Sequence, residues 1–395
     1  MISVHNKSSS RFTAVDITFI FISIINFLLF IVSSAIFYQE SMFSCCARLL
    51  LLLNLFLFCV LSLHVFQNKK TIQLSYILLI ATAISIFISY FLNPDGNVIE
   101  FLIRLCGYLS IPIYMITVQQ FSLSSKMESW FKFISIAYAL LFFGAAFYCP
   151  TYYPVSGALT IGFPNANTAG AIFLLNIIFV IIAFANSVNK LQRWISYTII
   201  GGLLYLILLS QCRSAFLLSL VCFAYILLPV SFRPGKYYIC LCFCSSYIFY
   251  YFYTYLFESG WNIDATLLDR PIYSGRQQAF VEYGLEYTFF GDFSIDGLNL
   301  AATLINALGL IGTFWLMACY MSILFSPFFQ DLHDLNNCRK NLSLFCLGIL
   351  FVHGCVEVAF FTAGSFFGSM IGCILAAIAC NRKNILISSR TEGRT

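Results

Sequence analysis

One apolar stretch decides the class of fold: residues 168–185 read TAGAIFLLNIIFVIIAFA and contain no charged side chain. A helix needs about 20 such residues to cross the hydrocarbon core of a bilayer. Similar runs recur along the 395 residues of the chain, of which 61% are hydrophobic and 9% charged. A soluble domain carries about 25% charged residues, so this composition cannot supply a water-exposed surface. The sequence therefore predicts an all-α, polytopic integral membrane protein.

The apolar runs predict about twelve transmembrane helices within a single membrane domain that covers residues 1–395. The expected spans are 15–38, 49–67, 72–92, 98–118, 129–149, 167–187, 193–210, 214–231, 236–256, 299–326, 341–359 and 362–380. Most connections between them are short. The exception is residues 257–298, a polar loop of about forty residues, and a loop that long usually carries function.

The basic residues predict the orientation in the membrane. The net charge is +5, but the Lys and Arg residues lie in small groups between spans, which favours membrane topology over nucleic-acid binding. With the N-terminus in the cytoplasm, 16 of the 21 basic residues fall in cytoplasmic segments. These are Lys7, Arg11, Lys69, Lys70, Lys126, Lys132, Lys190, Arg193, Arg233, Lys236, Arg339, Lys340, Arg382, Lys383, Arg390 and Arg394. Both termini are thus expected in the cytoplasm, and the long loop is expected on the outer side.

The remaining basic residues are all arginines. They are Arg48, Arg104, Arg213, Arg270 and Arg276. Topology requires positive charge and does not distinguish lysine from arginine, whereas two parallel hydrogen bonds to a phosphate or carboxylate require a guanidinium. The outer arginines therefore suggest an anionic ligand.

Two motifs mark the outer ends of the middle spans. The first, GFPNANTAG at 162–170, enters a span with Asn165 and Asn167, whose amides either cap the helix or bind sugar hydroxyls; capping is the simpler interpretation. Its small residues allow another backbone to approach closely. The second, SQCRS at 210–214, interrupts two apolar runs. Arg213 is there expected at the outer boundary, either extended toward water or in contact with an anion.

The long loop contains Arg270 and Arg276. Arg276 heads a segment, 276–287, with Phe and Tyr at helical spacing, which predicts a short amphipathic helix on the membrane surface. An arginine beside a helix N-terminus attracts an anion through its charge and through free backbone N–H groups. The alternative is a pair of ordinary solvated loop arginines.

Three residues are candidates for proton transfer. His353 and Glu357 lie four residues apart in the span 341–359, so they share a helix face, either as a catalytic pair or as a mutually satisfied structural pair. Asp292 is one of several acids on the outer side. No nucleotide-binding or metalloprotease motif is present, and no metal or cofactor is expected.

Taken in order, these motifs resemble a known superfamily, the bacterial O-antigen polymerases (Wzy) and O-antigen ligases. The matching segments are Phe163-Pro164-Asn165 with Ala169, Ser210 to Ala215, Gly275-Arg276, Phe290-Gly291 and Leu308 to Gly312. The resemblance covers about residues 155–320. This chain departs from the family's Ser-Arg-Gly segment, because Cys212 stands where Ser is usual and Ser214 replaces Gly.

The resemblance implies a GT-C-like glycosyltransferase of the bacterial inner membrane, active on its periplasmic side. Its substrate would be an oligosaccharide linked to undecaprenyl pyrophosphate. Arg213 and Arg276, with Arg270 as a helper, would bind the diphosphate. Glu357, His353 and Asp292 would be the candidates for the general base. The implied partners are the lipid bilayer and a chain-length regulator protein, with no nucleic acid.

A missing histidine separates the two branches. Ligases resemble one another in a His-Asn pair about eleven residues before the Leu-Gly-Leu-Ile-Gly segment, and this chain has Leu298-Asn299 there. The absence of His favours an O-antigen polymerase over a ligase that transfers polymer to lipid A core. A transporter or flippase is the alternative from another class. It would be expected to carry ionisable groups near the bilayer midplane and repeated halves, and no convincing repeat is visible.

Overall fold

The structure is a computed structural model, and it does not describe every residue. The described residues are 12–33, 41–67, 74–92, 98–121, 123–124, 126–154, 156–163, 165–185, 187, 189–227, 266–267, 270–271, 289–291, 300–324, 342, 345–350, 352–353 and 366–392.

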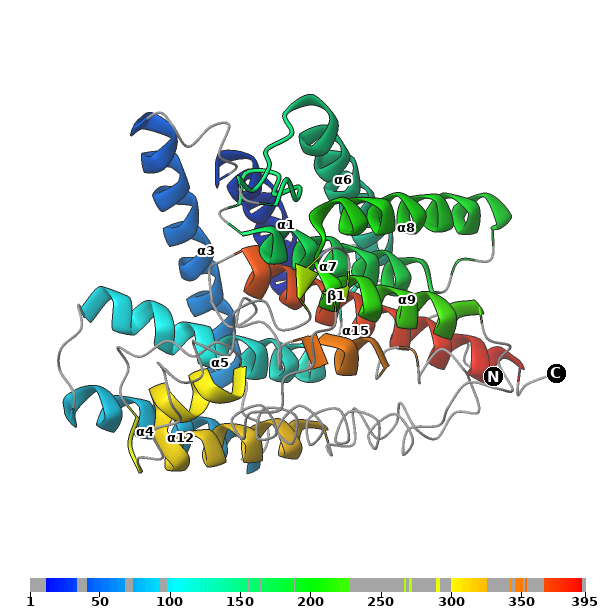
Figure 1. Cartoon of the computed structure of the whole chain (residues 1–395). Coiled ribbons are helices and arrows are strands. Elements are labelled where there is room, and N and C mark those ends of the chain that lie inside the picture. Colours follow the sequence, from blue (N-terminus) through cyan, green and yellow to red (C-terminus); the bar gives the residue numbers. More distant parts are fainter. Residues whose placement is uncertain are drawn as a thin grey trace, which may run out of the picture.

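The described chain is almost entirely helical (Figure 1). Its helices are α1 (Ala14–Ser33), α3 (Ser41–Gln67), α4 (Leu74–Leu92), α5 (Val98–Gln120), α6 (Lys126–Tyr148), α7 (Ala166–Phe184), α8 (Lys190–Ser210), α9 (Arg213–Leu227), α12 (Leu300–Leu324) and α15 (Phe366–Glu392). The described chain also contains two short antiparallel strands, β1 (Thr266–Leu267) and β2 (Arg270–Pro271), and the connections between helices.

The helices agree with a multi-pass membrane protein. Among the described residues, seven helices are long and apolar enough to cross a membrane, namely α1 and α3 to α8. Three shorter apolar helices lie within α9, α12 and α15. Ten of the twelve expected spans thus coincide with one of the ten described helices. The expected span 236–256 lies outside the described residues, and the span 341–359 is described only in part.

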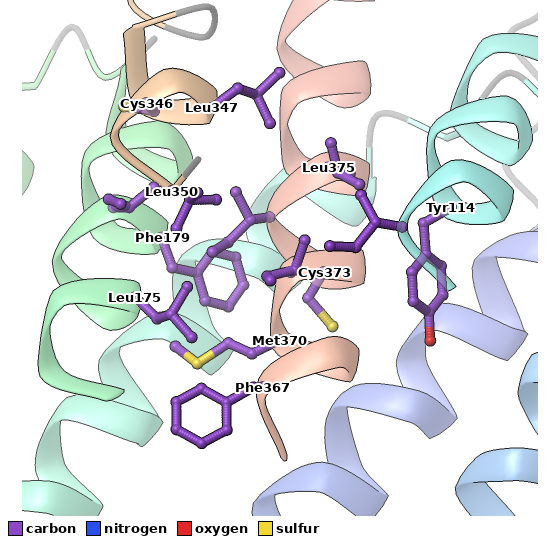
Figure 2. Packing of buried hydrophobic residues seen from close by; sticks show 14 of the residues in the cluster. Tyr114, Leu175, Phe179, Cys346, Leu347, Leu350, Phe367, Met370, Cys373 and Leu375 are labelled. Carbon is purple, nitrogen blue, oxygen red and sulfur yellow. The ribbon is translucent and has the colours of Figure 1, made fainter. Parts of the chain in front are cut away.

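Helix α7 forms the centre of the bundle. It packs against α6, α8, α9 and α15, and every residue in it except Asn167 and Thr168 is buried. A helix that is apolar on all sides is stable only where other helices surround it. Figure 2 shows α15 between α7 and α5, with Met370 facing Leu175 and Phe179. On its other side Gly372 lies against the Tyr114 ring, which a Cβ would approach to 2.9 Å.

Buried amides connect the helices at defined points. Asn54 of α3 donates to the Ser369 hydroxyl of α15 at 2.7 Å. With its amide correctly oriented, Asn176 of α7 donates to the Ser135 carbonyl of α6 at 3.2 Å and accepts from the Ala139 N–H at 3.1 Å. Lipid is as apolar as leucine, so such directional contacts decide which helix faces meet.

Helix α12 contains a kink at which the end of the long loop returns. Gly309 has φ +68° and ψ −179°, a conformation open essentially to glycine alone. The Ile311 N–H, two residues further on, donates to the Phe289 carbonyl at 3.2 Å. Two segments that the sequence presents as separate motifs, around Gly291 and Gly309, are therefore in backbone contact.

Gly309→Ala is expected to lower the free energy of unfolding by roughly 3 kcal/mol or more, because a backbone-strain cost and an overpacking cost add. A Cβ at Gly309 would lie 2.5 Å from both the Gly291 nitrogen and the Phe289 oxygen. Thermal unfolding of the purified protein in detergent measures the loss. The matched control is Gly157→Ala, since Gly157 also has positive φ (+64°) but nothing within 4 Å of its Cβ position. Equal losses in the two variants would contradict the steric contact.

Candidate functional site

The two sequence motifs meet at one end of the bundle. Helix α8 ends at Ser210, Gln211 takes the left-handed conformation that ends a helix, and α9 begins at Arg213. This tight turn brings α9 back beside α7. The Cys212 thiol donates to the Asn167 carbonyl at 3.7 Å. The N-termini of α7 and α9 therefore lie side by side, and we call this region the α7–α9 site.

A glycine permits this close approach. A Cβ at Gly170 would overlap the Cys212 Cβ and lie 2.7 Å from its sulfur and 3.1 Å from the Ser210 hydroxyl. The expectation that small residues at the start of this span let another backbone approach is confirmed for Gly170. The Cys212 and Ser210 side chains of the turn are thus packed directly against the backbone of α7 at Gly170.

The two asparagines have different surroundings. Asn165 is the N-cap of α7, and its side-chain oxygen accepts from the Asn167 N–H at 2.9 Å. The capping interpretation is therefore confirmed for Asn165, which stabilises such a helix by about 1 kcal/mol. Asn165 is nevertheless exposed, and Asn167 is half-buried, so both remain at the surface of the site.

A short ordered loop borders the site. The loop, described at residues 151–154 and 156–163, lies between α6 and α7. The Thr160 N–H donates to the Thr151 carbonyl at 2.8 Å, and the Thr151 hydroxyl accepts from the Gly162 N–H. The Leu159 N–H donates to the Leu209 carbonyl at 2.9 Å, which ties the loop to the end of α8. We call this segment the outer loop.

Backbone strain is concentrated at the same place. Ile161 (φ +45°) and Gln211 (φ +53°) are the only non-glycine residues with positive φ in the described part of the chain. They precede the starts of α7 and α9. Ile161 is β-branched and fully buried, and this conformation costs about 1–2 kcal/mol. Strain of this kind persists where the surrounding structure imposes it, and it is common at functional sites.

The electrostatics of the α7–α9 site favour an anion. The aligned peptide dipoles of each helix give its N-terminus a partial positive charge, and two such termini lie together here. Arg213, half-buried at the first position of α9, adds a full charge. A cation at a helix N-terminus is unfavourable by about 0.5 kcal/mol for the helix itself.

Two of the other predicted site residues, His353 and Arg270, are within the described part of the chain. His353 is fully buried in a short helical segment. Arg270 is in β2, where it pairs with Leu267. Three others, Arg276, Asp292 and Glu357, and the predicted amphipathic helix at 276–287 lie outside the described residues.

The order of the outer loop was not predicted from the sequence. Four turn-forming residues, Pro150, Pro154, Gly157 and Gly162, were a sufficient signal for an ordered turn. The strain at Ile161 had no local signal, because isoleucine is a residue that avoids positive φ. Among the described residues, no group of three or more His, Cys, Asp or Glu side chains could hold a metal ion.

Comparisons of the chain with protein-family models, with curated proteins and with solved structures find no match. The geometry of the α7–α9 site and the motifs within it therefore carry the functional argument.

Proposed function

We propose that the chain is a membrane glycosyltransferase that joins polysaccharide repeat units carried on undecaprenyl pyrophosphate. The observation that supports this most directly is the meeting of Arg213 and the two helix N-termini at the α7–α9 site. A lipid diphosphate carries its negative charge at the boundary between membrane and water. Two positive helix ends and a guanidinium at the end of apolar helices suit that ligand.

In the proposed reaction, a hydroxyl of the incoming unit attacks the anomeric carbon of the growing chain. The bond from that carbon to the diphosphate oxygen breaks, undecaprenyl pyrophosphate leaves with the electron pair, and the hydroxyl proton passes to a base. Arg213 stabilises the charge that develops on the leaving group. Arg276 and Arg270 are proposed to assist it from the long loop.

The proton acceptor is proposed among Glu357, His353 and Asp292. His353 is fully buried, and this position suits a group that orients another side chain more than one that contacts the acceptor sugar. A chain-length regulator protein is a further proposed partner.

Deletion of the gene is expected to leave lipid A core that carries a single repeat unit, because assembly and ligation of one unit do not need a polymerase. Lipopolysaccharide gel electrophoresis measures this pattern, with the complemented strain as control. Core without any repeat unit, together with polymer held on the carrier lipid, would instead identify a ligase. An unchanged gel would exclude both activities on O-antigen.

We further propose that the α7–α9 site faces the periplasm of a bacterial inner membrane and that both termini are cytoplasmic. A fusion after Ser156 is expected to give active alkaline phosphatase, and a fusion after Asn189 a fluorescent cytoplasmic reporter, because α7 lies between these positions. The basic residues Lys190 and Arg193 favour this orientation. A fluorescent reporter after Ser156 and active phosphatase after Asn189 would instead place the α7–α9 site on the cytoplasmic side.

A further inference from the structure

The outer loop exposes aromatic side chains and buries aliphatic ones. Ala158, Leu159 and Ile161 are buried, whereas Tyr152 is 58% and Tyr153 38% exposed. Two tyrosines that are consecutive in the sequence are thus accessible at the surface of this loop, where a ligand can reach them.

These tyrosines belong to an ordered backbone. Tyr152 forms an antiparallel bridge with Leu159. The Tyr153 N–H donates to the Ala158 carbonyl at 2.8 Å, and the Gly157 N–H donates back to the Tyr153 carbonyl at 2.9 Å. A tyrosine on such a backbone loses little conformational entropy when a ligand binds, because only two side-chain torsions remain to be ordered.

The outer loop reaches the α7–α9 site through one side chain. The Gln211 amide donates to the Ser156 carbonyl at 3.5 Å, and Gln211 is two residues from Arg213. The loop follows the end of α6 and precedes the start of α7, so it lies beyond the helix ends. A saccharide attached to a diphosphate also extends beyond the membrane boundary. A diphosphate held at Arg213 would therefore direct its sugars toward this loop.

We infer that the outer loop is a saccharide-binding subsite, in which Tyr152 and Tyr153 contact the faces of sugar rings and the exposed Asn165 amide pairs with sugar hydroxyls. The C–H groups on one face of a pyranose carry partial positive charge, and the face of an aromatic ring is negative. A side-chain amide offers both a donor and an acceptor, as a hydroxyl does. This inference rests on the proposed function and specifies where the glycan portion of its substrate binds.

Tyrosine is also common where membrane meets water, where its ring anchors a protein in the headgroup region. Substitution of the tyrosines distinguishes a membrane anchor from a saccharide contact. An anchoring tyrosine affects insertion and thermal stability and is indifferent to saccharide. A subsite tyrosine affects saccharide affinity while insertion and stability are retained.

The test uses the full-length protein in lipid nanodiscs and a phosphate-free probe, the repeat-unit oligosaccharide released from the polysaccharide of the same strain. Titration followed by saturation-transfer NMR measures its affinity. Tyr152→Ala/Tyr153→Ala is expected to weaken binding about tenfold or more, as loss of aromatic stacking does at other sites. Tyr152→Phe/Tyr153→Phe is expected to bind within about twofold of wild type, because the ring faces remain.

Tyr148→Ala is the matched control, because Tyr148 is 87% exposed at the end of α6 but lies outside the outer loop. Its affinity for the oligosaccharide is expected to be unchanged. Unchanged affinity in the double alanine variant, equal loss in Tyr148→Ala, or no binding by the wild-type protein would each overturn the subsite. Loss of thermal stability in the double alanine variant without loss of affinity would identify a membrane anchor. Since the probe carries no diphosphate, none of these results decides the polymerase proposal, which the gel tests separately.

Discussion

Gly170→Ala is expected to separate α7 from the turn between α8 and α9 and to remove the site. The added methyl group would overlap the Cys212 Cβ and lie 2.7 Å from the Cys212 sulfur. Neither side can easily move: α7 is buried on nearly all sides, and Cys212 is fully buried. Overpacking of a rigid core costs about 1–3 kcal/mol, and we expect the upper part of that range or more. Thermal unfolding in detergent and polymer yield in complemented cells measure the two consequences.

A compensating change makes this prediction specific. Cys212→Gly removes the two nearest of the three atoms that the new methyl group would meet and leaves only the Ser210 hydroxyl at 3.1 Å, so the double variant Gly170→Ala/Cys212→Gly is expected to recover stability relative to Gly170→Ala. Gly201→Ala in α8 is the control, because nothing lies within 4 Å of its Cβ position. A Gly170→Ala protein as stable as Gly201→Ala would show that α7 and the turn are not in contact.

Features that depend on local sequence were predicted correctly. The apolar runs locate the described helices, because a helix must satisfy its own backbone hydrogen bonds within lipid. The break around Arg213 and the cap at Asn165 follow from polar residues between apolar runs. The small residue Gly170 indicated a close contact.

Which helices pack against each other could not be predicted. Helix α4 packs against α12, more than two hundred residues away in the sequence, and hydropathy cannot indicate this because every lipid-facing or helix-facing residue is equally apolar. The contact of Gly309 with Gly291 was not predictable either, because a glycine in the sequence does not indicate which backbone will approach it. The positive φ of Ile161 was not predictable because a β-branched residue gives no signal for that conformation.

Arg213→Ala is expected to reduce polymer formation at least a hundredfold while the protein still inserts in the membrane. The loss of one preorganised charge or donor at a developing oxyanion typically costs two to three orders of magnitude in rate. Arg213→Lys is expected to recover little, because an ammonium cannot form two parallel hydrogen bonds to a phosphate. If Arg276 also contacts the diphosphate, as proposed, Arg276→Ala should behave in the same way. In-vitro turnover of the lipid-linked repeat unit measures the rate, and immunoblotting of membranes measures insertion.

Arg48→Ala provides the control for general loss of outer charge, since Arg48 is exposed near the start of α3, a helix whose main packing partners are α1 and α5. Its polymer yield is expected to remain near that of wild type. The contrast separates two explanations of Arg213: an arginine that serves only topology would behave like Arg48, and a ligand of the diphosphate would not. Polymer of full length and amount in Arg213→Ala cells would contradict the proposal that Arg213 binds the diphosphate. If Arg213→Lys had the full rate, the positive charge at this position would still be required, but two parallel hydrogen bonds to the diphosphate would be excluded.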